Sequence, residues 1–281
     1  MREADVRGAR RLLVLALVAV LAACSGAGTS PSDPLVDRAG KTGKLTIGIR
    51  FDQPGLSERT VDGRYAGFDV EVAKYVANAL GVGPDGITWR ETTSATRETD
   101  LTSGTVDMVV AAYSITAKRK ERVAFAGPYF TTGQDLLVRR SSADITGPDS
   151  LNDKRLCSVA GSTPAEQVRD RFAQAVRLVE YPRYPDCVTA LLAGQVDAVT
   201  TDAVILAGYV AQNPELLRVV GKAFSTERYG VGLRKGDAKT VTAVGDAIRQ
   251  MIGDGEWLKS LQRTIGASGY PLPAPPGVTE R

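Results

Sequence analysis

The chain has 281 residues, a formal net charge of +3 at pH 7 and no histidine. The lack of histidine excludes histidine-based catalytic triads and the common zinc sites, so we expect no catalytic residue, no metal ion and no cofactor. Four arginines and two acidic residues give residues 1–23 a net +2, and the nearly neutral remainder argues against nucleic acid as a partner.

The N-terminus is predicted to be a secretory signal. Basic residues up to Arg11 precede an uncharged apolar run, Leu12–Ala23, which is shorter than the roughly 20 residues that span a bilayer. The run ends in Leu21-Ala22-Ala23-Cys24, which resembles the bacterial lipobox, where cleavage leaves a diacylated cysteine at the new N-terminus. An ordinary signal peptide with a chance cysteine is the alternative. Residues 24–43 begin with small polar residues and are predicted to be a flexible tether.

From residue 44 onward, segments with strand character alternate with segments of helical periodicity. In chain order they are a strand at Lys44–Ile49, a helix at Phe68–Leu80, a strand at Ile87–Trp89, a helix at Thr93–Gly104 and a strand at Val106–Ala111. Strands that alternate with helices predict an α/β fold with mainly parallel sheets and helices on both faces.

The same pattern recurs in the second half of the chain. It predicts strands at Arg155–Val159, Leu178–Tyr181 and Val196–Thr200, and helices from Gly161 towards Val176, over Asp186–Ala193 and over Ala203–Val210. Leu101–Asp107 and Leu192–Asp197 share a helix end, a glycine turn and a Val-Asp strand start, which indicates two similar lobes. Ligands of open α/β sheets bind beyond the carboxyl ends of the strands, so we expect the cleft between the lobes.

The apolar segments Gly133–Arg139 and Arg228–Leu233 are expected to be the two strands that cross between the lobes. The helices Val241–Ile252 and Glu256–Ile265 would then return to the first lobe or the hinge. The predicted organisation is a first lobe of residues 44–136 with a return segment of 228–270, a second lobe of 137–227, and a C-terminal tail of 271–281.

Three cysteines occur in the chain. If Cys24 carries lipid, Cys157 and Cys187 remain as an even pair, and an oxidising exterior favours a disulfide between them. Two buried free thiols are the alternative, because cysteine packs well as a small apolar residue.

Ordered motifs give the chain a resemblance to a known family. They are Gly67–Ala73, Val106-Asp107, Ser114–Phe125 and Gly127–Phe130. They resemble the family 3 extracellular solute-binding proteins, the polar amino-acid group of ABC importers, over about residues 44 to 266. The resemblance implies a two-lobed periplasmic-binding-protein fold of type II. The spacing of Cys157 and Cys187, together with Thr200-Thr201-Asp202 and Tyr229–Leu233, is most similar to the glutamate-binding branch of actinobacterial type.

The α-carboxylate site of this family carries over to Arg119, with Ser114 supplying a hydroxyl and Ala112 a backbone group. Arg119 follows the strand that is predicted to end at Ala111, and a planar guanidinium donates two parallel hydrogen bonds to a carboxylate. A solvated arginine at a charged helix start is the alternative.

On the second lobe, the resemblance assigns Asp202 to the ligand ammonium, with an N-cap of the following helix as the alternative. Gly161, Ser162 and Thr163 open a helix whose free N–H groups favour an anion, so they can hold a ligand carboxylate; simple capping is the alternative. The family frequently has a lysine where this chain has Val159, so this side depends on hydroxyls and backbone groups.

Arg97 resembles the arginine of the glutamate-binding branch, and a second guanidinium suits a side-chain carboxylate. A surface arginine paired with Glu98 or Asp100 is the alternative. Phe51, together with Asp52 and Gln53, ends the first strand and is expected to wall the site.

These residues, together with the resemblance, predict a monomeric binding protein outside the cytoplasm, anchored to the membrane by lipid on Cys24. It would capture glutamate or aspartate, or the amides glutamine or asparagine, for an ABC permease. A sensor that presents its ligand state to a membrane signalling protein has the same sequence features. An enzyme akin to dehydratases is disfavoured, because the chain has no histidine and no Gly-x-Ser-x-Gly motif.

Overall fold

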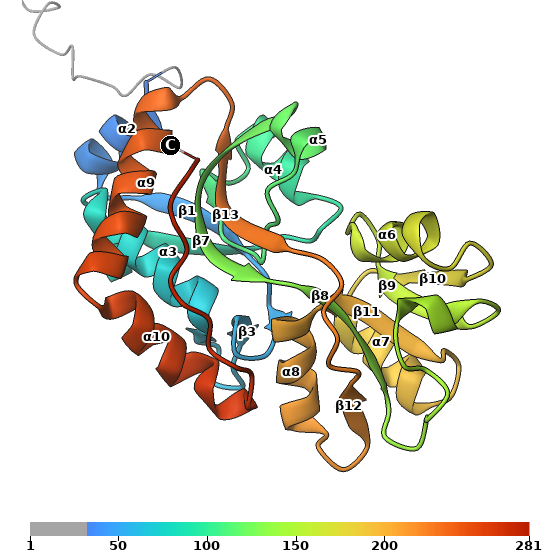
Figure 1. Cartoon of the computed structure of the whole chain (residues 1–281). Helices are drawn as coiled ribbons and strands as arrows, with labels where there is room; N and C mark the ends of the chain where they lie inside the picture. The colour runs from blue at the N-terminus through green and yellow to red at the C-terminus, as the bar shows by residue number, and fades with distance from the viewer. Residues whose placement is uncertain (1–32, 281) are drawn as a thin grey trace, which may run out of the picture. The chain divides into compact units, whose positions relative to one another are not determined.

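Two five-stranded sheets organise residues 33–280, the part of the chain that the computed structural model describes (Figure 1). The predicted signal peptide and Cys24 lie outside the described residues. Each sheet, with its helices, forms one lobe. We define lobe one as residues 34–132 and 227–280, and lobe two as residues 134–219. The predicted two-lobed α/β fold is confirmed.

The first part of lobe one is built from short elements. Its helices are α2 (Leu35–Thr42), α3 (Phe68–Ala79), η1 (Pro84–Gly86), α4 (Arg97–Ser103) and α5 (Ala117–Lys120). Its strands are β1 (Leu45–Ile49), β2 (Asp52–Gln53), β3 (Ser57–Arg59), β4 (Tyr65–Ala66), β5 (Ile87–Glu91), β6 (Met108–Val109) and β7 (Val123–Thr132). After lobe two, the chain returns through β13 (Glu227–Arg234), α9 (Ala238–Gly253), α10 (Glu256–Thr264) and η3 (Gly266–Ser268).

Lobe two contains β8 (Gln134–Arg139), η2 (Pro148–Leu151), β9 (Arg155–Val159), α6 (Pro164–Arg171), β10 (Arg177–Tyr181), α7 (Tyr184–Leu192), β11 (Ala198–Asp202), α8 (Ala203–Gln212) and β12 (Leu217–Val219). Its strand order is β10-β9-β11-β8-β12, and the order in lobe one is β5-β1-β6-β13-β7. In both sheets the strands that open a β-α-β unit pair in parallel. The other pairings are antiparallel, so the sheets are mixed instead of mainly parallel as predicted. The strands β8 and β13, which follow the two crossings, pair antiparallel to their neighbours.

The crossings between the lobes fall at Gly133 and at residues 220–226. Gln134 already belongs to β8, so lobe two begins a few residues earlier than the predicted boundary at 136/137. The two crossing segments lie against each other, because the Phe224 N–H donates to the Gln134 carbonyl at 3.0 Å and the Gln134 N–H donates to Ser225 Oγ at 3.0 Å. This mutual hydrogen bonding makes the pair of segments a single hinge.

The core of lobe one explains why the C-terminal helices return to it. Phe68, Val72 and Val76 lie on one face of α3 and are fully buried, as helical spacing predicts. Figure 1 shows α9 beside α3 and α10 below them. Trp257, on α10, is buried against Phe68 and donates its indole N–H to the Tyr129 carbonyl at 2.7 Å.

The predicted tether of residues 24–43 is wrong for its last part. Residues 35–42 form α2, and Leu35 and Ala39 are buried. The Leu35 N–H donates to Asp237 Oδ2 at 2.7 Å, so the helix start is held by the start of α9. The apolar side chains in this stretch have a surface to pack on, whereas the small polar residues that motivated the prediction precede it.

The segment that follows η3 crosses lobe one and ends on β7. The Gly127 N–H donates to the Glu280 carbonyl at 2.9 Å, and the Thr279 N–H donates to the Gly127 carbonyl at 2.8 Å. Lys120 and Glu280 form an ion pair at 2.7 Å. The predicted tail is therefore bound to lobe one next to α5.

Several element boundaries differ from the sequence prediction. The helix expected from Thr93 begins at Arg97, because Thr93 and Thr96 form a turn in which the Thr96 N–H donates to Thr93 Oγ1 at 3.2 Å. The strand expected over Val106–Ala111 is confined to Met108–Val109, and the helix after Gly161 ends at Arg171 rather than near Val176. Local side-chain hydrogen bonds of Thr compete with helix formation.

Cys157 on β9 and Cys187 on α7 form a disulfide with a Cα–Cα distance of 5.7 Å, which confirms the predicted pairing. Among residues 33–280, no helix has the length and apolar character needed to cross a membrane. Within the same residues, no group of three acidic or cysteine side chains is placed to hold a metal ion.

Candidate functional site

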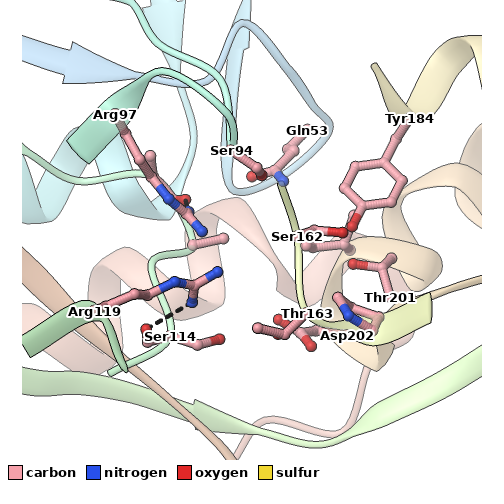
Figure 2. Close-up of a pocket in the computed structure, with 14 residues that line it drawn as sticks. Gln53, Ser94, Arg97, Ser114, Arg119, Ser162, Thr163, Tyr184, Thr201 and Asp202 are labelled. Carbon is pink, nitrogen blue, oxygen red and sulfur yellow. Dashed lines mark hydrogen bonds between the residues drawn. The ribbon is translucent and has the colours of Figure 1, made fainter. Parts of the chain in front are cut away.

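A pocket between the lobes collects polar side chains from both of them (Figure 2). Its empty volume, which includes space open to solvent, is about 330 Å³. From lobe one it is lined by Gln53, Ser94, Arg97, Ala111, Ala112, Ser114 and Arg119, and from lobe two by Ser162, Thr163, Pro164, Tyr184, Thr201, Asp202 and Ile205. Most of these residues follow the carboxyl ends of β5, β6, β9 and β11, where ligands of α/β sheets bind.

Two buried arginines form the lobe-one side of the pocket. Arg97, at the start of α4, is 4% exposed and Arg119, on α5, is 6% exposed. Both guanidinium groups flank the Tyr113 ring, at 3.9 Å and 5.2 Å from its centroid. Arg119 Nη1 donates to the Ser114 carbonyl at 2.8 Å, and Arg97 Nη1 donates to the Ala111 carbonyl at 3.4 Å. Within residues 33–280 neither guanidinium forms an ion pair.

The alternative of a surface Arg97 is wrong. Glu98 pairs with Arg122 at 2.9 Å, and Asp100 accepts a hydrogen bond from Thr92 Oγ1 at 2.8 Å. Both acids are therefore engaged elsewhere, while the guanidinium of Arg97 points into the pocket (Figure 2). The alternative of a solvated Arg119 is wrong for the same reason, since its side chain is buried.

The two guanidinium groups make this side of the pocket positively charged, which favours binding of an anion. Burial, and next the nearby charge of Arg119, lower the pKa of Arg97 to about 9, so the group remains a cation at neutral pH. Its Nε is buried without a hydrogen-bond partner. Unpaired buried charge is costly, so a carboxylate that enters the pocket relieves both the repulsion and the missing hydrogen bond.

Asp202 provides the opposite charge from lobe two. It ends β11, is 5% exposed, and accepts a hydrogen bond from the Tyr229 hydroxyl through Oδ2. Burial, and secondarily the charge of Glu227, raise the pKa of Asp202 to about 7, while Tyr229 and the arginines oppose this shift. Asp202 occupies the N-cap position of α8, but its side chain makes no capping bond. The capping alternative therefore does not account for this carboxylate.

Ala112 adopts a left-handed backbone conformation, with φ at 45°. Its N–H donates to Oδ2 of Asp69 at 2.8 Å, and Oδ1 of that buried carboxylate accepts from the Tyr129 hydroxyl at 2.8 Å. Because the amide is occupied, the backbone group that Ala112 can offer a ligand is its carbonyl, an acceptor. This arrangement gives Asp69, within the Gly67–Ala73 motif, a role in shaping the pocket wall.

The loop before α6 supplies hydroxyls from lobe two. Ser162 Oγ donates to the Val159 carbonyl at 2.5 Å, which restrains it, whereas Thr163 stands at the N-cap of α6 without a side-chain capping bond. Gly161 does not line the pocket, but it packs against lobe one. Its φ is 74°, and a Cβ built on it would lie 2.8 Å from the Ala95 Cα. Only glycine permits this approach of the lobes.

The structure corrects the prediction for Phe51 and Asp52, which do not line this pocket. Asp52 is held by Arg50 through two hydrogen bonds, of 2.9 Å and 2.7 Å. Phe51 packs against Tyr65, with ring centroids 5.0 Å apart. Of the three residues expected after the first strand, Gln53 does line the pocket.

Several lining residues were missed in the sequence. Thr201 is adjacent to Asp202 within a motif that was singled out, and Ser94 precedes Arg97 in the same loop, so proximity was an available signal. Tyr184 and Ile205 carry no such signal, because their positions on α7 and α8 are set by how lobe two packs.

Comparisons with known proteins identify the family of the chain. Residues 45–267 match the family model for bacterial extracellular solute-binding proteins, family 3. The glutamate-binding protein GluB of Corynebacterium efficiens is 44% identical over 236 residues, which is 80% of each chain. The glutamine-binding protein of Geobacillus stearothermophilus is 35% identical over 208 residues, which is 74% of this chain and 79% of that one.

Solved structures of amino-acid-binding proteins are also similar to this chain. An ancestral arginine-binding protein bound to glutamine is 32% identical, with a TM-score of 0.75, and the match covers 80% of this chain and 98% of that one. The ancestral amino acid-binding protein AncCDT-1, described as a precursor of cyclohexadienyl dehydratase, is 30% identical with a TM-score of 0.75 and covers 82% of this chain and 99% of that one.

Proposed function

The chain belongs to the bacterial extracellular solute-binding proteins of family 3, and from this premise we propose that it captures an acidic amino acid, glutamate or aspartate, for an ABC importer. The observation that carries the proposal is the charge of the pocket lining. Two buried arginines face one carboxylate, Asp202. With Asp202 ionised, the pocket has an excess of one positive charge, and an acidic amino acid carries one excess negative charge.

The proposal gives the three charged residues different roles. Arg119 binds the ligand α-carboxylate, together with the hydroxyl of Ser114, and Asp202 binds the α-ammonium. Arg97 binds the side-chain carboxylate. A neutral amide ligand would leave one guanidinium without an anion, and an arginine ligand would add a third cation to the pocket, which electrostatics disfavours.

The relatives support this ligand class. The two relatives named above are a glutamate-binding protein and a glutamine-binding protein. Because the relatives are binding proteins and the pocket offers no nucleophile beside a general base, we propose that this protein binds its ligand without turning it over.

We further propose that the protein acts outside the cytoplasm as a monomer and is held on the membrane by lipid on Cys24. The partner that receives the ligand is then a membrane permease. A sensor would bind the ligand in the same way, so the two functions are distinguished by what the protein serves. If it serves an importer, deletion of its gene should abolish uptake of radiolabelled glutamate.

The proposal is tested by isothermal titration of the protein that lacks residues 1–24 with glutamate, aspartate, glutamine, asparagine and arginine. We expect the two acids to bind most tightly and arginine to bind most weakly. Tighter binding of arginine than of both acids would overturn the proposal. After prolonged incubation, NMR of the mixture should show unchanged glutamate.

A further inference from the structure

Gln53 also lines the pocket, but the proposed roles of the charged residues do not involve it. Its side chain is 3% exposed, and its Oε1 is buried without a hydrogen-bond partner. In the view of Figure 2, Gln53 and Ser94 lie in the same upper part of the pocket as the Arg97 guanidinium, whereas Ser114 and Asp202 lie in the lower part. In this view Gln53 lies at the end of the pocket where Arg97 is proposed to bind the ligand side chain.

That end contains a second unsatisfied group. Arg97 Nε is a buried donor without an acceptor, and Gln53 Oε1 is a buried acceptor without a donor. An unpaired buried polar group costs about 1–3 kcal/mol, so the two positions favour a ligand group that pairs with both. A primary amide does this directly, because its oxygen accepts from Arg97 and its NH₂ donates to Gln53.

A carboxylate can be paired as well, because the Gln53 side chain is an amide. Rotation of its terminal group exchanges the acceptor oxygen for the NH₂ donor. The backbone beneath it is fixed: the Gln53 carbonyl accepts from the Leu56 N–H at 3.1 Å, and the preceding residue, Asp52, is bound by Arg50 and by the Tyr209 hydroxyl. Only the end of the side chain needs to turn.

We propose that Gln53 is a specificity-determining residue, which pairs with either a carboxylate or a primary amide at the side-chain end of the ligand and so sets the ratio of glutamate to glutamine affinity. The inference rests on the proposed function, since it assumes that an amino acid occupies the pocket. The inference adds that glutamine also binds. A glutamine ligand leaves Arg97 without an anion, and its hydrogen bond with Gln53 offsets this cost.

The test is Gln53→Glu, measured by titration with glutamate and with glutamine at pH 8. A carboxylate at position 53 accepts from the ligand amide but repels a ligand carboxylate, and like charges in contact cost several kcal/mol. Glutamate affinity should fall by about tenfold or more, while glutamine affinity changes by less than about threefold. Gln250→Glu is the matched control, because Gln250 is an exposed residue of α9 in the same lobe; it should leave both affinities unchanged.

Gln53→Met provides a second arm if the buried glutamate prevents folding, which circular dichroism would reveal. It keeps the donors of Arg97 for a carboxylate but removes the acceptor for an amide, so glutamine should be weakened more than glutamate. An unchanged affinity ratio in whichever variant folds would overturn the role of Gln53 while leaving the proposed function intact. If the wild-type protein binds neither ligand, the proposed function fails, and this inference fails with it.

Discussion

The hydroxyl of Tyr229, on the return strand β13, donates a hydrogen bond to Oδ2 of Asp202, at the end of β11 in lobe two. The backbone of Tyr229 also pairs with Ser114 of lobe one. One residue near the hinge thus links a hydroxyl-bearing lining residue of one lobe with the carboxylate of the other. The ligand ammonium and α-carboxylate would be bound on either side of this link.

Tyr229→Phe should weaken amino-acid binding without abolishing it. The variant removes one hydrogen bond to a buried carboxylate, a loss worth roughly a 3- to 10-fold change in affinity, and it should raise the pKa of Asp202 further, because that bond favours the ionised form. Titration calorimetry at pH 8 measures the first effect. Tyr75→Phe is the matched control, since Tyr75 donates to Asp254 on the surface. Equal effects of the two variants would contradict a role at the site.

Binding should weaken as the pH falls below neutrality. The pKa of Asp202 is raised to about 7 in the ligand-free protein, and an ammonium ligand pairs with the ionised form only. Below this pH the carboxyl must first lose its proton, so affinity should decline towards tenfold per pH unit. Arg119, Arg97, Tyr229 and Glu227 are the charged or titratable groups around it that influence this value.

The measurement is titration of glutamate at pH 7 in buffers of different ionisation enthalpy. A positive slope of heat against buffer enthalpy would report proton uptake and contradict the prediction, because we expect proton release on binding. The release should be lost in Asp202→Asn, which has no proton to lose.

The three charged lining residues should respond differently to truncation. Arg119→Ala and Asp202→Ala should weaken every amino-acid ligand by a factor of order 30 or more, because each leaves a buried ligand charge unpaired. Arg97→Ala should weaken glutamate and aspartate more than glutamine and asparagine, since only an ionised side chain needs the cation. Titration of the three variants with the four ligands checks this pattern.

Arg122→Ala is the control for the arginine variants. Arg122 lies three residues after Arg119, but its side chain is 56% exposed and pairs with Glu98. It should bind all four ligands like the wild type. If Arg97→Ala weakened all four equally, Arg97 would not recognise the side-chain end of the ligand.

Loss of the disulfide should destabilise lobe two. Cys157 and Cys187 are separated by 30 residues, and closing a loop of that length stabilises a fold by on the order of 3 kcal/mol in the chain-entropy account. The double variant Cys157→Ser and Cys187→Ser should therefore unfold at lower denaturant concentration, which fluorescence would report. An unchanged midpoint would show that the bond does not contribute to stability.

Cys24 should determine where the full-length protein resides. With a diacylated Cys24 the protein should sediment with membranes, because two acyl chains hold stably where one binds only marginally. Cys24→Ala should release it into the soluble fraction. A variant that stayed membrane-bound to the same extent would rule out anchoring through this residue.

Much of the fold was predictable because its signals are local. The apolar face of α3 repeats at helical spacing, and the strands that begin after Asp107 and Asp197 follow glycine turns. The alternation of elements and the two lobes could therefore be inferred from periodicity. The exact ends of the elements were not predictable, because local side-chain hydrogen bonds compete with helix formation. Thr93 and Thr96 delay the start of α4, and the first turn of α2 hydrogen-bonds to Asp237 and Thr240, which are distant in the sequence.

The sequence by itself determined the residue types of the site: a guanidinium at 97 and 119, a carboxylate at 202, and the cysteine pair, all recognisable from motifs. Only the tertiary structure decided which of these converge. It brought Tyr184 and Thr201 into the pocket and, of the three residues after the first strand, placed Gln53 there and left Phe51 and Asp52 outside. The reason is physical: a motif specifies a side chain and its local backbone, whereas burial, charge balance and unsatisfied hydrogen bonds arise only when segments distant in the chain meet across the cleft.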